Sequence, residues 1–325
     1  MRSLHRAAPV ACLIALLAAW PGAKARAADA FPTHVVKIVV PAAAGSTTDT
    51  VARLVADKLA RTWSQSVIVE NIAGGAMNIG AERVAHAAPD GYTMLVCPPS
   101  PVSINQLLYR DIDYDPLKFT PVALLAKIPN ALVVRKDLPA NSVGELIAYA
   151  KANPGKLTYG SQGVGSTAHL SASQMEVLAR IRMVHVPYRG ALPALNDVIA
   201  GHIDMFFDTL TTSVPLWRAG KVRILAVASP ERSPDVPELP TIAESGLPGF
   251  RSITWFILVA PPGTPAAIAD KVNRDVNDAF GELGEKFRAI RLEPMPGTPA
   301  DAARFIADET KLWGNVIKQA HITAQ

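Results

Sequence analysis

One segment, 41–50, gathers small residues and hydroxyl groups directly after a β-branched run at 35–40. Its candidate binding residues are Ala44, Gly45, Ser46, Thr47 and Asp49. Small residues let a backbone approach another group closely, hydroxyl oxygens cap helices, and an acid in the first turn suits the helix dipole. Because the first N–H groups of a helix have no partners within it, the segment suits an anion, held here without Lys or Arg. It also fits an ordinary strand-to-helix connection.

A second segment, 160–169, combines serines, glycines and a histidine. Ser161 or Ser166 with His169, and Asp208 from farther along the chain, supplies the residue types of a serine hydrolase. The stretch around Ser161 lacks the first glycine of the G-x-S-x-G motif, so the pattern does not demand this interpretation. His169 also fits a capping or ligand-binding role.

Motifs for cofactors and metals are incomplete in this sequence. Gly163, Gly165 and Ala168 match the G-x-G-x-x-A dinucleotide pattern, but no acid ends the strand that follows. The chain has no G-x-x-x-x-G-K-[ST] phosphate loop, and its histidines show no paired zinc spacing. We therefore expect no bound cofactor and no metal.

Other candidate binding residues lie at the ends of predicted strands. Met77 and Asn78 belong to a small-residue loop at 71–78. Tyr188 follows one strand, and Asp208 ends another. Asp208 fits either an acid that faces a ligand or a cap for the turn that follows it.

The elements that position these residues repeat in order. Strand, small-residue loop, helix, strand, loop, helix, turn and strand are predicted at 36–97 and again at 157–208. Two such βαβαβ units predict an α/β fold with two parallel-core sheets and helices on both faces. Ligands of parallel sheets bind outside the carboxyl ends of the strands, where the candidate loops lie. Two units facing each other would enclose one cleft.

The chain is expected to cross between these units twice. Strands at 122–125 and 131–134 flank the first crossing, and the proline-rich segment 229–248 makes the return. Helices at 268–280 and 298–320 should then pack back onto the first unit. Two crossings give a hinge geometry. The expected domains comprise residues 28–128 with 250–325, and residues 129–249 with the returning segment.

The first 27 residues are typical of an export signal. Basic residues precede an apolar stretch at 7–20, which is too short to span a bilayer comfortably, and a small-x-small pattern ends at Ala27. Cleavage after Ala27 would leave Cys97 as the one cysteine, which excludes an internal disulfide. The net charge of +4 comes from this segment and the remainder is neutral, so charge gives no indication of nucleic-acid binding.

Short stretches along nearly the whole mature chain resemble one family, the tripartite tricarboxylate transporter substrate-binding proteins, also called the Bug family. The matching stretches are 39–49, 70–71, 78–81, 88–93, 154–157, 161–170, 184–188, 205–208 and 258–261. The chain departs from the family pattern at Ala42, Ser46 and 72–77. The departure at 72–77 concerns the distal pocket, where specificity lies, so aliphatic, aromatic and amino-acid-like carboxylates all stay open as ligands.

The resemblance implies a periplasmic receptor with a two-domain periplasmic-binding-protein-like fold (type II) and a ligand cleft between the domains. Such a receptor is not an enzyme. It would capture a small organic carboxylate, clamp it between the first loop of each domain and deliver it, as a monomer, to membrane transporter subunits. The candidate ligand-binding residues are Ala44, Gly45, Ser46, Thr47, Asp49, Met77, Asn78, Ser161, Gly163, Gly165, Ser166, Thr167, His169, Tyr188 and Asp208.

Two alternatives remain open at this point. One is a periplasmic hydrolase that uses Ser161 or Ser166 with His169. The other is a ligand sensor whose closed form docks on a membrane kinase. Transport and sensing use the same ligand-stabilised closure, so the sequence does not separate them.

Overall fold

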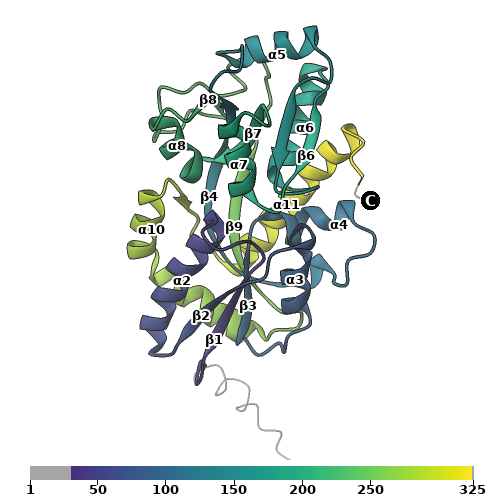
Figure 1. The fold of residues 1–325 in the computed structure, drawn as a ribbon. Coiled ribbons are helices and arrows are strands. Elements are labelled where there is room, and N and C mark those ends of the chain that lie inside the picture. The colour runs from purple at the N-terminus through teal and green to yellow at the C-terminus, as the bar shows by residue number, and fades with distance from the viewer. Residues whose placement is uncertain (1–30, 324–325) are drawn as a thin grey trace, which may run out of the picture.

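The structure is a computed structural model that describes residues 31–323 (Figure 1). The predicted signal peptide, residues 1–27, and its cleavage point after Ala27 lie outside the described residues. Within 31–323, no helix is both long enough and apolar enough to cross a membrane. The fold is α/β, as predicted, and its strands form one curled, mixed sheet with helices packed against it.

The first half of the molecule is built on three parallel strands. β1 (Val36–Val40) lies between β2 (Val67–Asn71) and β3 (Thr93–Cys97). Ile38, Val39 and Val40 are fully buried, which explains why the run is apolar on both faces. The helices of this half are α2 (Thr47–Trp63), α3 (Asn78–Ala85), α4 (Asn105–Leu108), α9 (Ala266–Asp278), α10 (Phe280–Ala289) and α11 (Pro299–Gln319).

The second half repeats the same arrangement. β5 (Thr158–Ser161) lies between β6 (Val184–Pro187) and β7 (Met205–Thr209), and all three are parallel. β8 (Val222–Val227) is antiparallel to the connecting strand β4 (Thr120–Arg135). The helices of this half are α5 (Val143–Ala152), α6 (Thr167–Ala179), α7 (Ala191–Ala200) and α8 (Leu210–Arg218). The two parallel cores that the sequence predicted are therefore present.

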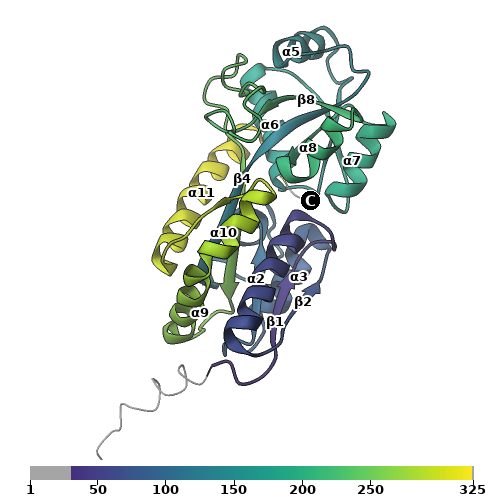
Figure 2. The same ribbon diagram turned by 90° about the vertical axis from the view of Figure 1, so that its left-hand side faces the viewer.

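Two long strands join the halves. β4 pairs with β9 (Ile253–Ala260) over its first part and with β7 over its last part, so the sheet is continuous from one half to the other. Figure 2 shows β4 and α11 running along the length of the molecule, with α7 and α8 above α2 and α3. The helix α11 contacts β4 and also α6 of the second half.

The prediction of two separate strands at 122–125 and 131–134 was wrong, because both belong to β4. Pro121 and Pro129 lie within this strand and interrupt its apolar pattern. Proline lacks the N–H that a strand donates. β4 tolerates both prolines, and its register against β9 shifts in two places along this region.

Several boundaries also differ from the prediction. The helix predicted at 268–280 ends at Asp278, and α10 follows it directly, although the sequence analysis did not predict α10. The segment before α4 is a π-helical turn, Ser100–Ile104, and α8 was predicted only as a turn. The remaining short elements are the 3₁₀ turns Gly75–Met77 and Pro116–Lys118 and the strand β10 (Glu293–Pro294).

Candidate functional site

A cavity of about 720 Å³ lies between the two halves. The first half contributes residues 41–44, 46–48, 73–77, Pro98 and Ser100. The second half contributes residues 188–193 together with Gln162, Gly163, Ser166, Thr167, Asp208, Thr209 and Thr212. Thr254 and Phe256 of the joining strand β9 complete it. These loops follow the carboxyl ends of parallel strands, where the sequence placed the ligand cleft.

The first loop of each half ends in the same three residues, Gly-Ser-Thr, and forms the same local structure. Ser46 caps α2 by accepting a hydrogen bond from the Asp49 N–H at 3.2 Å. Ser166 caps α6 by accepting from the His169 N–H at 3.4 Å. Each preceding glycine has a positive φ, 80° at Gly45 and 81° at Gly165, which glycine adopts at low cost. The sequence analysis overlooked this shared triplet, which could have identified the two loops as equivalent.

The two loops place two helix N-termini at one cavity. Thr47 and Thr167 are the first residues of α2 and α6, and both line it. The first N–H groups of an α-helix have no acceptors within the helix, and the helix dipole makes this end positive. Two such ends from opposite halves suit an anion without a lysine.

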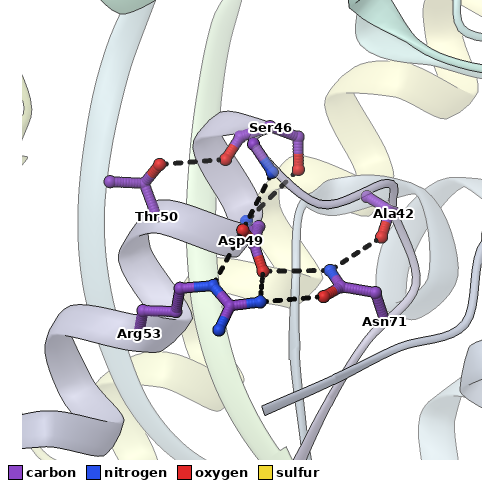
Figure 3. A network of polar contacts seen from close by, with 7 residues as sticks. Ala42, Ser46, Asp49, Thr50, Arg53 and Asn71 are labelled. Carbon is purple, nitrogen blue, oxygen red and sulfur yellow. Dashed lines mark hydrogen bonds and ion pairs between the residues drawn. The ribbon is translucent and has the colours of Figure 1, made fainter.

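Asp49 supports the first loop from behind the cavity (Figure 3). Its carboxylate accepts hydrogen bonds from the Gly45 N–H at 2.9 Å, from Arg53 Nε at 3.0 Å and from Asn71 Nδ2 at 3.0 Å. Burial alone would favour the neutral acid, but these hydrogen bonds hold the pKa of Asp49 below its ordinary value. Asn71 also donates to the carbonyl of Ala42 at 3.0 Å, which fixes the loop at its other end.

His169 occupies the corresponding position behind the second loop. Its Nδ1 accepts from the Gly165 N–H at 3.2 Å, and its ring stacks on His185 with centroids 4.2 Å apart. Burial lowers the pKa of His169 to about 3 and that of His185 to about 4, so both rings are neutral at physiological pH. A neutral imidazole can accept the glycine N–H, as the Asp49 carboxylate does in the first loop.

The geometry does not assemble the serine hydrolase arrangement. Ser161 Oγ lies 2.6 Å from His185 Nε2, not against His169, and Ser161 is fully buried. Ser166 Oγ donates to the carbonyl of Gly163 at 2.8 Å. Within residues 31–323, neither serine hydroxyl is hydrogen-bonded to the His169 ring.

The candidate binding residues divide into two groups. Nine line the cavity: Ala44, Ser46, Thr47, Met77, Gly163, Ser166, Thr167, Tyr188 and Asp208. Six lie behind it: Gly45, Asp49, Asn78, Ser161, Gly165 and His169. Asn78, for example, accepts from Tyr114 Oη at 2.9 Å and is buried. Which of these residues contact a ligand stays a prediction.

Some lining residues were not among the predicted binding residues. Thr254 and Phe256 face the cavity, whereas Trp255 between them points away and donates to Glu309 at 3.0 Å. The alternation of side chains along a strand was the signal that could have found them. Arg189 lines the cavity as well, and its side chain is exposed to solvent.

Asp208 is the one acid among the lining residues, and it is only 2% exposed. Its Oδ2 accepts from Thr212 Oγ1 at 2.5 Å, which ties it to the turn that follows, and its contact with a ligand stays a prediction. Burial raises the pKa of Asp208 to about 7, although hydrogen bonds from Thr212 and the Thr209 N–H oppose the shift.

The rest of the cavity is largely apolar. Alanine and proline residues of several loops line it together with Met77, Leu192 and Phe256, and Arg189 is its one basic residue. No group of three or more histidine, cysteine, aspartate or glutamate side chains within residues 31–323 could hold a metal ion. The cavity thus combines an anion site with an apolar chamber suited to a hydrocarbon chain.

An α/β fold in two halves, with a mostly apolar cavity between them and two helix N-termini directed at it, defines a solute-binding protein. The sequence model of the tripartite tricarboxylate transporter family receptor matches residues 51–322, and the chain belongs to this family.

Individual relatives agree with this assignment. The chain is 33% identical to protein BugT of Bordetella pertussis, covering 90% of this chain and 91% of BugT. The structure of R. palustris Rpa4515 with adipate has a TM-score of 0.87 and 40% identity, covering 90% of this chain and 99% of that one. The structure of MatC (Rpa3494) from Rhodopseudomonas palustris with bound malate has a TM-score of 0.83 and 35% identity, covering 88% and 100%. The predicted family is confirmed.

Proposed function

We propose that this protein is an extracytoplasmic solute-binding protein that captures a small organic carboxylate between its two halves. The observation that carries the proposal is the pair of Gly-Ser-Thr loops, which bring two helix N-termini to one cavity. Backbone N–H groups and hydroxyls at such ends bind a carboxylate without a paired cation. Relatives that hold adipate and malate support a ligand of this class.

The protein releases its ligand unaltered and delivers it to a tripartite tricarboxylate-type membrane transporter. Family membership supports this role, and so do the burial of Ser161 and the neutral, structurally engaged imidazole of His169. The mature chain acts as a monomer in the periplasm, after cleavage behind Ala27. Residues 28–128 with 250–325 form one domain and residues 129–249 the other, with β4 and β9 as the hinge between them.

The test is binding of a carboxylate panel, adipate and malate included, to residues 28–325, measured by calorimetry and thermal shift. A ligand that binds only the folded state raises the midpoint of unfolding. Thr47→Val and Thr167→Val remove one hydroxyl each and keep the side-chain shape. Each should weaken binding by about tenfold, because a hydrogen bond to a charged group contributes about 1.5 kcal/mol or more.

Thr120→Val is the matched control, since Thr120 bonds to the carbonyl of Pro261 outside the cavity. It should leave the affinity unchanged. The uncharged diamide of adipate should not bind. Equal binding of the diamide and the acid would contradict the anion site, and recovery of a chemically altered ligand after long incubation would contradict the receptor role.

A further inference from the structure

Asp208 is a buried carboxyl group in the cavity that is proposed to take a carboxylate. It lies at the end of β7 and lines the cavity, and its side chain is almost inaccessible to solvent. Within residues 31–323, its carboxylate forms no ion pair. Two ionised carboxylates in one buried site repel strongly, because water no longer screens them. The site must therefore resolve this repulsion when an anionic ligand enters.

A chain of hydroxyl groups links Asp208 to the first loop. Thr212 Oγ1 donates to Asp208 at 2.5 Å and lies 3.1 Å from Thr209 Oγ1. Thr209 Oγ1 lies 3.2 Å from Thr47 Oγ1, across the boundary between the halves. Thr47 is the first residue of α2, where the proposed anion site begins. Asp208 is thus only three hydroxyl hydrogen bonds away from that site.

Among the described residues, no neighbouring charged group accounts for the raised pKa of Asp208. The elements packed against β7 carry Lys127 and Arg135 on β4, Tyr159 on β5, His169 and Glu176 on α6, Asp197 on α7 and Arg218 on α8. None of them is among the groups that shift the pKa of Asp208, which burial raises to about 7. Arg189 lines the same cavity but is exposed. His169 and His185 stay neutral above about pH 5, because their pKa values are lowered.

Resting on the proposed function, we propose that the ligand is bound together with one proton, which Asp208 takes from solvent and presents as an O–H donor to the ligand carboxylate. No covalent bond forms or breaks. The neutral carboxyl group removes the repulsion and adds a hydrogen bond to the ionised ligand. The protonated Asp208 then favours a ligand that places a hydrogen-bond acceptor, namely a carboxylate, against its side chain.

The proposal sets the direction of the pH dependence. Below about pH 6, Asp208 already carries its proton, so binding takes up almost none and affinity depends little on pH. Above about pH 7, the free protein has lost the proton and must regain it to bind. The dissociation constant then rises by up to tenfold per pH unit.

The experiment is calorimetry of the mature protein with adipate at pH 5.5, 7 and 8.5, in buffers of different ionisation enthalpy. The dependence of the heat on the buffer gives the number of protons taken up. We expect close to one at pH 8.5. Asp208→Asn should take up none at pH 7 and 8.5, where both carboxyl groups of adipate are ionised, and its affinity should not change between these values. At pH 5.5 adipate is itself partly protonated, so the expectation there is that the wild type and Asp208→Asn exchange equal numbers of protons. Asp137→Asn changes an exposed acid just after β4 that does not line the cavity, and it should behave like the wild type.

A second variant keeps the test decisive if Asp208→Asn folds poorly. Thr212→Val removes a hydrogen bond that lowers the pKa of Asp208, so the pH profile of affinity should move to higher pH. Adipate binding with no proton uptake at pH 8.5, or uptake that persists in Asp208→Asn, would overturn this inference and leave the proposed function intact. Failure of every carboxylate in the panel to bind at pH 5.5 would overturn both.

Discussion

Two buried polar side chains, Asp49 and His169, hold the first loops of the two halves in place. Asp49 and His169 differ in chemistry, yet each accepts the N–H of the glycine in the Gly-Ser-Thr triplet that ends its loop. A carboxylate and a neutral imidazole can both do this because the task needs only an acceptor of suitable reach. Asp208 differs from them because it lines the cavity, and burial raises its pKa to about 7.

Asp208→Asn should make the unliganded protein more stable, and the gain should grow with pH. The folded protein binds the Asp208 proton up to about pH 7, whereas the unfolded chain releases it near its ordinary value of 3.8. Stability of the wild type therefore falls as pH rises from about 4 to 7, and the asparagine variant lacks this loss. Urea unfolding at pH 5 and pH 8 should show the difference increasing by on the order of 3 kcal/mol. An increase of the same size in Asp137→Asn would contradict this assignment.

At the scale of elements, the Gly-Ser-Thr loops are equivalent in local structure but not in surroundings. A Cβ added at Gly45 would meet nothing within 4 Å. One added at Gly165 would lie 2.6 Å from Leu108 Cδ1 of the first half. Nearby, Tyr109 Oη donates to the carbonyl of Val164 at 2.9 Å. The second loop is thus packed against α4 across the boundary between the halves, and the first loop is not.

Gly165→Ala should therefore destabilise the protein more than Gly45→Ala. Both impose a left-handed backbone on alanine, which costs about 1 kcal/mol. Gly165→Ala adds overpacking against Leu108, for roughly 2–4 kcal/mol in total. Leu108→Ala should cost less in the Gly165→Ala background than in the wild type, as a double-mutant cycle by urea unfolding would measure. Equal costs for the two glycines, with additive effects of Leu108→Ala, would show that the contact is absent in solution.

At the scale of the whole molecule, few hydrogen bonds join the two halves on the side of the cavity. Behind the cavity, one continuous sheet joins them. Thr47 meets Thr209 at 3.2 Å and Thr211 donates to the carbonyl of Ile290 at 2.7 Å. β4 and β9 run behind the cavity as one paired ribbon. Such an arrangement suits closure by bending of the ribbon, with the ligand bridging the two loops.

Ligand binding should shorten the distance between dyes at Ile79→Cys in the first half and Ile199→Cys in the second. Both side chains are exposed, and the native Cys97 is fully buried, so labelling is selective. Energy transfer should rise with saturating adipate, and should not rise in a protein that also carries Thr47→Val and Thr167→Val at the same adipate concentration. A pair within the first half, at Val35→Cys and Ile79→Cys, is the control and should not change. Unchanged transfer between the halves would refute hinge closure.

Much of the fold was readable because its signals are local. The buried run of β1, the hydroxyl caps of α2 and α6 and the order of strands and helices depend on neighbouring residues. Predictions failed where pairing with a segment distant in sequence outweighs a local preference of the residues. β4 contains two prolines and still pairs with β9, more than a hundred residues later, with a register shift directly after Pro121 and regular pairing at Pro129.

The sequence by itself determined the α/β class, the family and the two loops that end at helix N-termini, because propensity, capping and periodicity act over a few residues. Only the tertiary structure decided which polar groups reach the cavity. His169 and Asp49 turn behind their loops, whereas Asp208 and Thr254 line the cavity. These positions depend on how two halves of one sheet are set against each other, and such long-range packing is not encoded in any single stretch of residues.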